Sequence, residues 1–141
     1  MPSPARSLCP IALALDLFGD AWSLLVVRDL MFKGIASYGG FLAAGEGIAT
    51  NVLSDRLVKL EEAGIIEKRR DAVDGRRFVY RLTAKGADLA PVLVSMVLWS
   101  AKHTATDAPP EMVSAMAGDP SKFAMQVIRR VTEDEAGPAS R

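Results

Sequence analysis

The sequence has few of the residues on which metal, cofactor and disulfide sites depend. Its 141 residues include one cysteine, Cys9, and one histidine, His103. One residue of each type cannot make a disulfide within the chain or a Cys–His metal site. His103 stands at the expected C-terminal end of a helix, where a cation favours the helix dipole, so we do not assign it to catalysis. No phosphate-binding loop or dinucleotide motif is found. We therefore expect no catalytic residues, no cofactor and no metal.

Long apolar runs and an excess of charge of one sign are also absent. The 17 basic and 17 acidic residues cancel, which argues against a surface devoted entirely to nucleic acid, although charge can still be segregated. The longest strongly apolar stretch, residues 89–99, is shorter than the ~18 residues that a membrane-spanning helix needs. Half of the residues are hydrophobic (50%). These features indicate a cytoplasmic protein with one domain and no membrane contact.

Residues 47–82 predict a helix followed directly by a hairpin. Apolar side chains recur there at three- and four-residue steps, which is typical of a helix with one packed face: Ile48, Leu53, Leu57 and Leu60. Gly64 follows the last of them and can end the helix at Ala63. Residues 65–71 and 77–82 contain β-branched and aromatic residues, and Asp74-Gly75 between them predicts a turn.

The predicted hairpin is basic. Residues 68–81 contain six basic and two acidic residues, which leaves an excess of four positive charges. The basic residues are Lys68, Arg69, Arg70, Arg76, Arg77 and Arg81, and the acidic residues are Asp71 and Asp74. A helix with a polar face followed by a basic hairpin is typical of a winged helix-turn-helix, in which the helix enters the major groove and the wing reaches the backbone. The partner helix is expected at residues 38–44, capped by Ser37, with a turn at residues 45–47.

Several short motifs, taken in this order and at these spacings, resemble the HxlR family of bacterial transcription regulators. They are Cys9-Pro10, LFGDAWSLL at residues 17–25, Gly47-Ile48, LEEAGII at residues 60–66 and YRLTAKG at residues 80–86. The resemblance covers roughly residues 8–103. It implies a dimeric winged helix-turn-helix that binds operator DNA, in some members with an N-terminal cysteine that senses oxidants or electrophiles. Ala49, where the family often has a hydroxyl residue, and the continuation beyond residue 103 depart from the family pattern.

Candidate DNA contacts lie on the expected recognition helix and the wing. Four polar side chains off the leucine stripe are candidate base contacts: Thr50, Asn51, Ser54 and Asp55. Asn51 can pair with adenine and Asp55 can accept from cytosine, but an ion pair of Asp55 with Lys59 has equal weight. Arg56, beside the stripe, is a candidate brace for the fold. Contacts to the DNA backbone are expected from Ser37, Lys68, Arg76 and Arg77, with a solvated hairpin as the alternative.

The flanking helices are expected to form a homodimer. Residues 84–103 predict one long helix that is kinked at Pro91 and apolar on almost every side in its middle. A second copy of the chain should cover its outer side, and a first helix at residues 10–19 should join this interface. Trp22, in a second helix at residues 21–32, is expected in the core. The fold class is thus mainly α with a small antiparallel β-hairpin, as a winged helix-turn-helix domain at residues 8–103 with dimerisation helices at both ends.

The remaining residues are expected to form an appendage to this domain. A linker at residues 104–110, a helical extension at residues 111–132 and a disordered tail at residues 133–141 should follow the domain. The extension carries an apolar stripe of Phe123, Val127 and Val131, which should fold back on the dimerisation helices.

Cys9 is the candidate redox-sensing residue. At a helix start, the dipole and the nearby Arg6 would favour its reactive thiolate, whereas a thiol buried in the dimer interface is the structural alternative.

Two other functions stay open. One is a winged helix that binds another protein, and the other is a regulator with a small-molecule effector, whose apolar pocket would be lined by Met96, Trp99, Met112, Met116 and Phe123.

Overall fold

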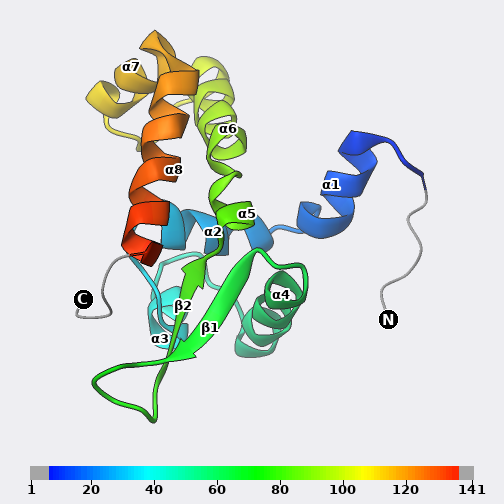
Figure 1. The fold of residues 1–141 in the computed structure, drawn as a ribbon. Coiled ribbons are helices and arrows are strands. Elements are labelled where there is room, and N and C mark those ends of the chain that lie inside the picture. The colour runs from blue at the N-terminus through cyan, green and yellow to red at the C-terminus, as the bar shows by residue number, and fades with distance from the viewer. Residues whose placement is uncertain (1–6, 137–141) are drawn as a thin grey trace.

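The computed structural model of the chain describes residues 7–136. Within them lie eight helices and two strands (Figure 1). In chain order they are α1 (Pro10–Phe18), α2 (Ser23–Phe32), α3 (Tyr38–Leu42), α4 (Thr50–Glu62), β1 (Ile66–Arg70), β2 (Phe78–Leu82), α5 (Ala84–Ala87), α6 (Ala90–His103), α7 (Pro110–Gly118) and α8 (Pro120–Ala136). The two strands pair antiparallel. The predicted fold class, mainly α with a small antiparallel hairpin, is confirmed.

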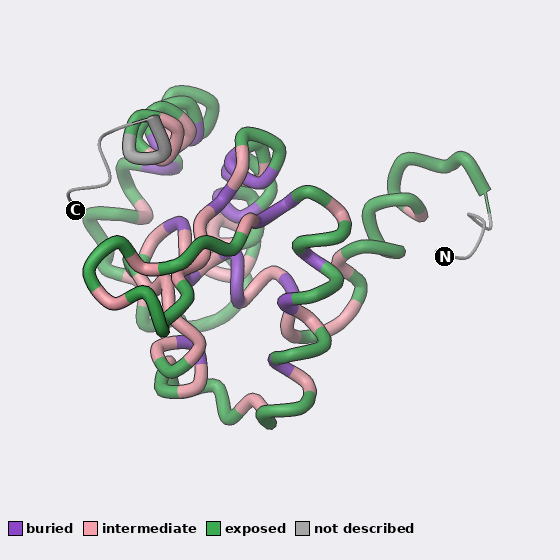
Figure 2. Tube along the Cα trace, turned by 60° about the horizontal axis from the view of Figure 1, so that its bottom comes forward, coloured by how far each residue is buried: buried purple, intermediate pink, exposed green. Residues whose placement is uncertain are grey.

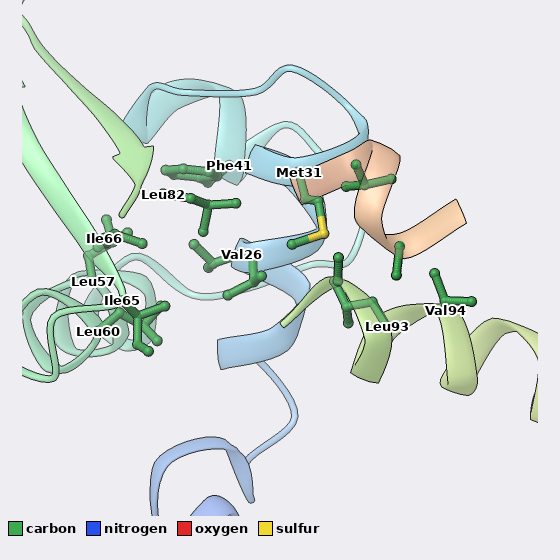
Figure 3. Close-up of a cluster of buried hydrophobic side chains, with 14 of the residues drawn as sticks. Val26, Met31, Phe41, Leu57, Leu60, Ile65, Ile66, Leu82, Leu93 and Val94 are labelled. Carbon is green, nitrogen blue, oxygen red and sulfur yellow. The ribbon is translucent and has the colours of Figure 1, made fainter. Parts of the chain in front are cut away.

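The core surrounds α2, with α4 and the base of the hairpin on one side and α6 and α8 on the other (Figure 3). The predicted leucine stripe of α4 supplies part of it, since Leu53, Leu57 and Leu60 are at most 4% exposed. They meet Val26 and Val27 of α2 in one buried cluster. Burying one stripe of α4 fixes the helix on the body and turns its polar side outward.

Both ends of α4 are set by local chemistry. At its C-terminal end Ala63 is the cap, and Gly64 has φ 77°, a conformation that disfavours residues with a Cβ, so the predicted end is confirmed. At its N-terminal end Ala49 offers no side-chain acceptor. Ile48, predicted as part of the helical stripe, precedes the helix and is half-buried against the core.

The long helix predicted at residues 84–103 is two helices. Thr83 caps α5, its Oγ1 accepting a hydrogen bond from the Gly86 amide at 3.1 Å. The helix is then interrupted, and α6 starts at Ala90 with Pro91 in its first turn. A proline there loses no helical hydrogen bond, whereas inside a continuous helix it would have removed one. The prediction of one helix kinked at Pro91 was therefore wrong.

The extension folds back on the body as predicted. α8 lies along α6 and also meets α5, α7 and β2 (Figure 1). Its apolar stripe joins the core: Val127 is buried, and Phe123 and Val131 are half-buried against the same cluster. The helix continues to Ala136, so residues 133–136 are helical where a disordered tail was expected. Residues 137–141 lie outside the described residues.

The first helix projects from the body. α1 packs chiefly against α2 and contains no buried residue (Figures 1 and 2). Its leucines at positions 13, 15 and 17 are 39%, 55% and 43% exposed. No surface within residues 7–136 covers these leucines, and leaving several leucines of one short helix exposed to water is unfavourable.

Gly86 of α5 packs against the backbone of Ile65, the residue before β1, and replacing it should destabilise the fold. A Cβ at this position would lie 2.2 Å from the carbonyl oxygen of Ile65. We expect Gly86→Ala to lower the free energy of unfolding by about 3 kcal/mol, measured by urea denaturation at fixed protein concentration. Gly118→Ala, where a Cβ meets nothing within 4 Å, is the matched control. Equal stability of the two variants would contradict this close packing.

Candidate nucleic-acid interface

The four predicted base-contact residues share the exposed side of α4. Thr50, Asn51, Ser54 and Asp55 are all exposed. They come from the first two turns of the helix, and the spacing of four between 50 and 54, and between 51 and 55, places them on one surface. The buried leucines face the opposite way. The structure thus brings these four side chains together at the N-terminal half of α4.

Two of the four side chains are already engaged within the chain. The Ser54 hydroxyl lies 3.1 Å from the hydroxyl of Tyr38. Asp55 accepts a hydrogen bond from Arg56, which lowers the pKa of the Asp55 carboxyl, and its Oδ2 lies 3.7 Å from Nζ of Lys59. The helix ion pair considered for Asp55 is therefore present. For the side chains of Thr50 and Asn51, the structure records no partner among residues 7–136, so both stay candidate base contacts.

Tyr38 holds the first turn of α4, a role that the sequence reasoning missed. Its hydroxyl donates to the carbonyl oxygen of Thr50 at 3.0 Å as well as lying beside Ser54. This contact joins α3 to α4 where Ala49 provides no side-chain cap. The only signal in the sequence was a tyrosine at the start of α3, since a tyrosine hydroxyl near a surface usually finds a polar partner.

Ser37 has the structural role that was predicted for it. Its Oγ accepts a hydrogen bond from the Gly40 amide at 3.0 Å and caps α3. The helix is shorter than predicted and ends at Leu42. Its two glycines account for this, because glycine disfavours helix continuation. A phosphate contact by Ser37 stays a prediction.

Arg56 braces α4 against the turn before α2. Its Nη1 lies 3.4 Å from Oδ1 of Asp20, whose Oδ2 accepts the amides of Trp22 and Ser23 at 2.8 and 2.9 Å. Burial alone would raise the pKa of Asp20, but the hydrogen bonds from Ser23 and Trp22, with Arg56 nearby, hold that pKa below its usual value. Asp20 therefore stays ionised. From three residues earlier in the chain it accepts the backbone amide of Ser23, the first residue of α2. Trp22, expected in the core, is only half-buried.

The wing carries cations on both faces. Lys68 pairs with Tyr80 and Arg70 with Phe78 in the strand register, and Nζ of Lys68 and Cζ of Arg70 lie 4.6 and 5.0 Å from the centroid of the Phe78 ring. Such cation–π contacts keep the charged groups close to the strands. On the other face Glu67 forms ion pairs with Arg69 and Arg81.

The connection between the strands is slightly longer than predicted, because each strand stops one residue short of its predicted end at the Asp-Gly turn. Residues 71–77 form the loop, and Gly75 does not adopt a positive φ. Asp71 organises it: its Oδ1 accepts the Val73 amide at 2.8 Å, and its own amide donates to the carbonyl of Arg77 at 2.9 Å. The hydrogen bond from Val73 lowers the pKa of Asp71. Arg76 and Arg77 are consequently presented at the exposed tip of the wing.

Cys9 is exposed at the start of α1. It is the residue before Pro10 and occupies the cap position, although its thiol makes no capping hydrogen bond. Its amide donates to Oγ of Ser7 at 3.3 Å. Burial of the thiol within a single chain is thus not seen. Arg6, expected to favour the thiolate, lies outside the described residues.

The five residues considered for an apolar effector pocket do not meet in one cavity. Met116 is 1% exposed inside the core, whereas Met96 and Trp99 are 49% and 68% exposed on the outside of α6. Phe123 is half-buried against the core and Met112 is exposed. This candidate pocket is therefore wrong.

The described residues contain neither a metal-binding group nor a single helix suited to cross a membrane. No three His, Cys, Asp or Glu side chains between residues 7 and 136 are grouped to hold an ion. In the same range, only α1 and α2 taken together, with a bend of 82° between them, reach the required length and composition.

Comparison with known proteins gives one consistent match. The HxlR-like helix-turn-helix family model matches residues 17–108. The uncharacterised helix-turn-helix regulator sll1512 of Synechocystis is 42% identical over 89 residues, which cover 63% of this chain and 65% of that protein. Regulator Rv3095 of Mycobacterium tuberculosis is 37% identical over 90 residues, 64% of this chain and 56% of that protein. The chain thus matches less than two thirds of the length of these relatives.

Solved structures share the fold. A putative transcription factor, PA1607, superposes with a TM-score of 0.64 at 38% identity, covering 74% of this chain and 71% of that one. The reduced form of the regulator YodB from Bacillus subtilis superposes with a TM-score of 0.57 at 26% identity, covering 69% of this chain and 95% of YodB.

Proposed function

The chain belongs to the HxlR-like helix-turn-helix family of transcription regulators, and we propose that it binds a palindromic operator as a homodimer. The observation that carries the proposal is the exposed polar surface at the start of α4 in a chain that also has an exposed basic wing. A helix of this kind fits the major groove, where Asn51 can read adenine, while Arg76 and Arg77 reach the flanking backbone or minor groove. Half-sites then lie about one helical turn, ~34 Å, apart.

The homodimer is supported by two uncovered apolar surfaces. On α6, Val92, Met96 and Trp99 are 45%, 49% and 68% exposed and line an open groove. On α1, Leu13 and Leu15 are exposed as well. Together these side chains of α6 and α1 form what we call the dimer face. A second copy of the chain covers it by presenting the same surface, which is the usual arrangement in twofold dimers.

Titration of the purified protein against DNA tests the operator proposal. The probe is the intergenic DNA upstream of its own gene, compared with scrambled DNA of the same composition at two salt concentrations. We expect a dissociation constant of about 10–100 nM for one palindrome, at least about 100-fold tighter than for scrambled DNA, and weakening steeply with salt. Equal, weak and salt-insensitive binding to both DNAs would support a protein-interaction module instead.

Asn51→Ala should relax the preference for one base pair. Loss of a bidentate contact costs about 1–3 kcal/mol of discrimination at one position and leaves the other positions unchanged. The measurement is competition with operators substituted at each base pair in turn. Glu62→Ala, an exposed change at the far end of the same helix, is the control and should leave every preference intact. A uniform loss across all positions would assign Asn51 to the backbone.

We further propose that Cys9 makes operator binding sensitive to oxidants. The thiol is exposed on the same projecting segment as α1, so its modification acts next to the dimer face. Among the relatives, Bacillus subtilis YodB has been solved both reduced and after diamide treatment. With one cysteine in the chain, diamide can join two chains through a Cys9–Cys9 disulfide, or a small thiol can cap Cys9 as a mixed disulfide.

Cys9→Ser should remove this response without changing binding under reducing conditions. For the unmodified protein we expect diamide to weaken operator binding at least about tenfold, with recovery after dithiothreitol, because a covalent link or adduct beside α1 alters the dimer. Cys9→Ser should show no change on either treatment. Anisotropy titrations and non-reducing gels measure the two effects. If Cys9→Ser loses affinity with diamide as the unmodified protein does, the cysteine is not the sensor.

A further inference from the structure

A pocket without a role in the proposed function lies between α8 and the base of the wing. It has a volume of about 290 Å³, and its walls come from the C-terminal end of α2, the loop before α3, β2 and α8. Figure 1 shows the C-terminal part of α8 coming down beside α2 towards β2. The family match ends at residue 108, before α7 and α8 begin. One wall of this α8–wing pocket is therefore specific to the extension.

The α8–wing pocket combines an apolar lining with two guanidinium groups. Ile35 and Val131 are among its apolar wall residues, Arg81 and Arg130 are its charged ones, and the described lining contains no carboxylate. Nη2 of Arg130 donates to the carbonyl oxygen of Met31 at 2.6 Å, which fixes this guanidinium at the pocket wall. This bond uses one of five N–H donors, so the planar group can still bind a carboxylate through two parallel hydrogen bonds.

The size and lining of the pocket select its ligand. Its volume is just below the ~300–1,000 Å³ typical of small-molecule sites, which restricts the ligand to about one ring. The apolar walls require an apolar body. Arg81 already forms an ion pair with Glu67, so it is the Arg130 guanidinium, bonded to a neutral carbonyl, that favours a negative charge. We propose that the α8–wing pocket binds a single-ring carboxylate, with the carboxylate on Arg130 and the ring against Ile35 and Val131, and that this binding changes operator affinity.

The pocket walls connect directly to the DNA-binding elements. Ile35 packs tightly against α3, where a Cβ on Gly40 would lie 2.8 Å from its Cγ2. The carbonyl of Ala36 accepts the amide of Tyr80 at 2.8 Å and so joins the loop before α3 to β2 of the wing. A ligand that prefers one relative position of α3 and the wing shifts the population towards it. This regulatory half of the inference rests on the proposed function, whereas the binding site does not.

Calorimetry with benzoate as the probe tests the site on the full-length protein. We expect one benzoate per chain with a dissociation constant of about 0.1–1 mM, as a small anion with few heavy atoms allows. Benzamide, which keeps the ring and loses the charge, should bind at least about tenfold more weakly. Arg130→Gln should weaken benzoate binding at least about tenfold. Arg129→Gln, at the neighbouring and likewise exposed arginine that is not part of the pocket lining, should change it less than about twofold.

The outcomes separate the two halves of the inference. No benzoate binding at 10 mM, or equal weakening by both arginine variants, overturns the site. Val131→Phe, which fills the pocket, gives an independent check because it should abolish binding while thermal unfolding reports that the variant is folded. Benzoate binding with an operator affinity changed less than about twofold overturns the regulatory half. Failure to bind any operator without benzoate contradicts the proposed function. In that case calorimetry still shows whether benzoate binds the α8–wing pocket.

Discussion

Met96→Asp should convert the homodimer to a monomer and abolish tight operator binding. Met96 is 49% exposed in one chain and lies in the centre of the dimer face on α6. The substitution places one carboxylate from each chain into an apolar interface, and desolvating these two like charges should raise the dimer dissociation constant at least about 10³-fold. A monomer contacts only one half-site, so we expect operator affinity to fall at least about 100-fold.

Met125→Asp is the matched control for this experiment. Met125 is also a methionine on a helix, is 54% exposed and lies on α8, outside the dimer face. Light scattering should report a dimer for Met125→Asp and a monomer for Met96→Asp at the same concentration. Met96→Asp that is still dimeric would place the interface elsewhere. Monomeric protein from both substitutions would indicate a general loss of structure, which circular dichroism checks directly.

Replacing Arg76 and Arg77 together with alanine should weaken binding to every DNA sequence. Both side chains are at the exposed tip of the wing, and a dimer presents the pair twice. Each phosphate contact contributes about 0.9 to the slope of log affinity against log salt, so four contacts account for up to ~3.6 of that slope. We expect the slope to become shallower by up to this amount and the affinity near 0.15 M salt to fall about 10²–10³-fold.

A charge-matched variant separates a local role of the wing from total charge. Lys122 and Arg129 are exposed cations on α8, and the double alanine substitution there removes the same net charge. We expect it to change the salt slope by less than one unit. If both double variants flatten the slope equally, DNA does not contact the wing, and the hairpin is only a solvated charged surface. Loss at a single base-pair position would instead assign Arg76 or Arg77 to base reading.

Periodic burial explains why the sequence predicted the recognition helix and the hairpin well. The leucines of α4 recur at helical spacing because one stripe must be buried, and Gly64 follows at the point where a positive φ closes the helix. The strands of the wing likewise have local signals in their β-branched and aromatic residues. The back-folding of α8 followed from its stripe of Phe123, Val127 and Val131.

Features that depend on contacts distant in sequence could not be predicted. The hydroxyl of Tyr38 reaches α4 only because α3 packs at a particular angle. The brace between Arg56 and Asp20 joins residues far apart in the chain. The break before Pro91 is set by the packing of α5 at Gly86 against the carbonyl of Ile65, a contact between residues distant in the chain. The hydrogen bond that the Asp71 side chain accepts from the Val73 amide likewise belongs to the loop, where the sequence placed Asp71 at the end of a strand.

The proposed homodimer would make the lifetime of the protein depend on its own concentration, because the exposed first helix is covered only by a second copy. α1 has nine residues, fewer than the ~12–15 that an isolated helix needs to be stable in water. In the proposed homodimer, association and the folding of this segment are one equilibrium, so the segment is ordered only where the protein is abundant enough to pair. Scarce chains carry an unfolded N-terminal arm open to proteases. Degradation then removes the regulator fastest when little of it is present, which sharpens the boundary between cells that contain it and cells that do not.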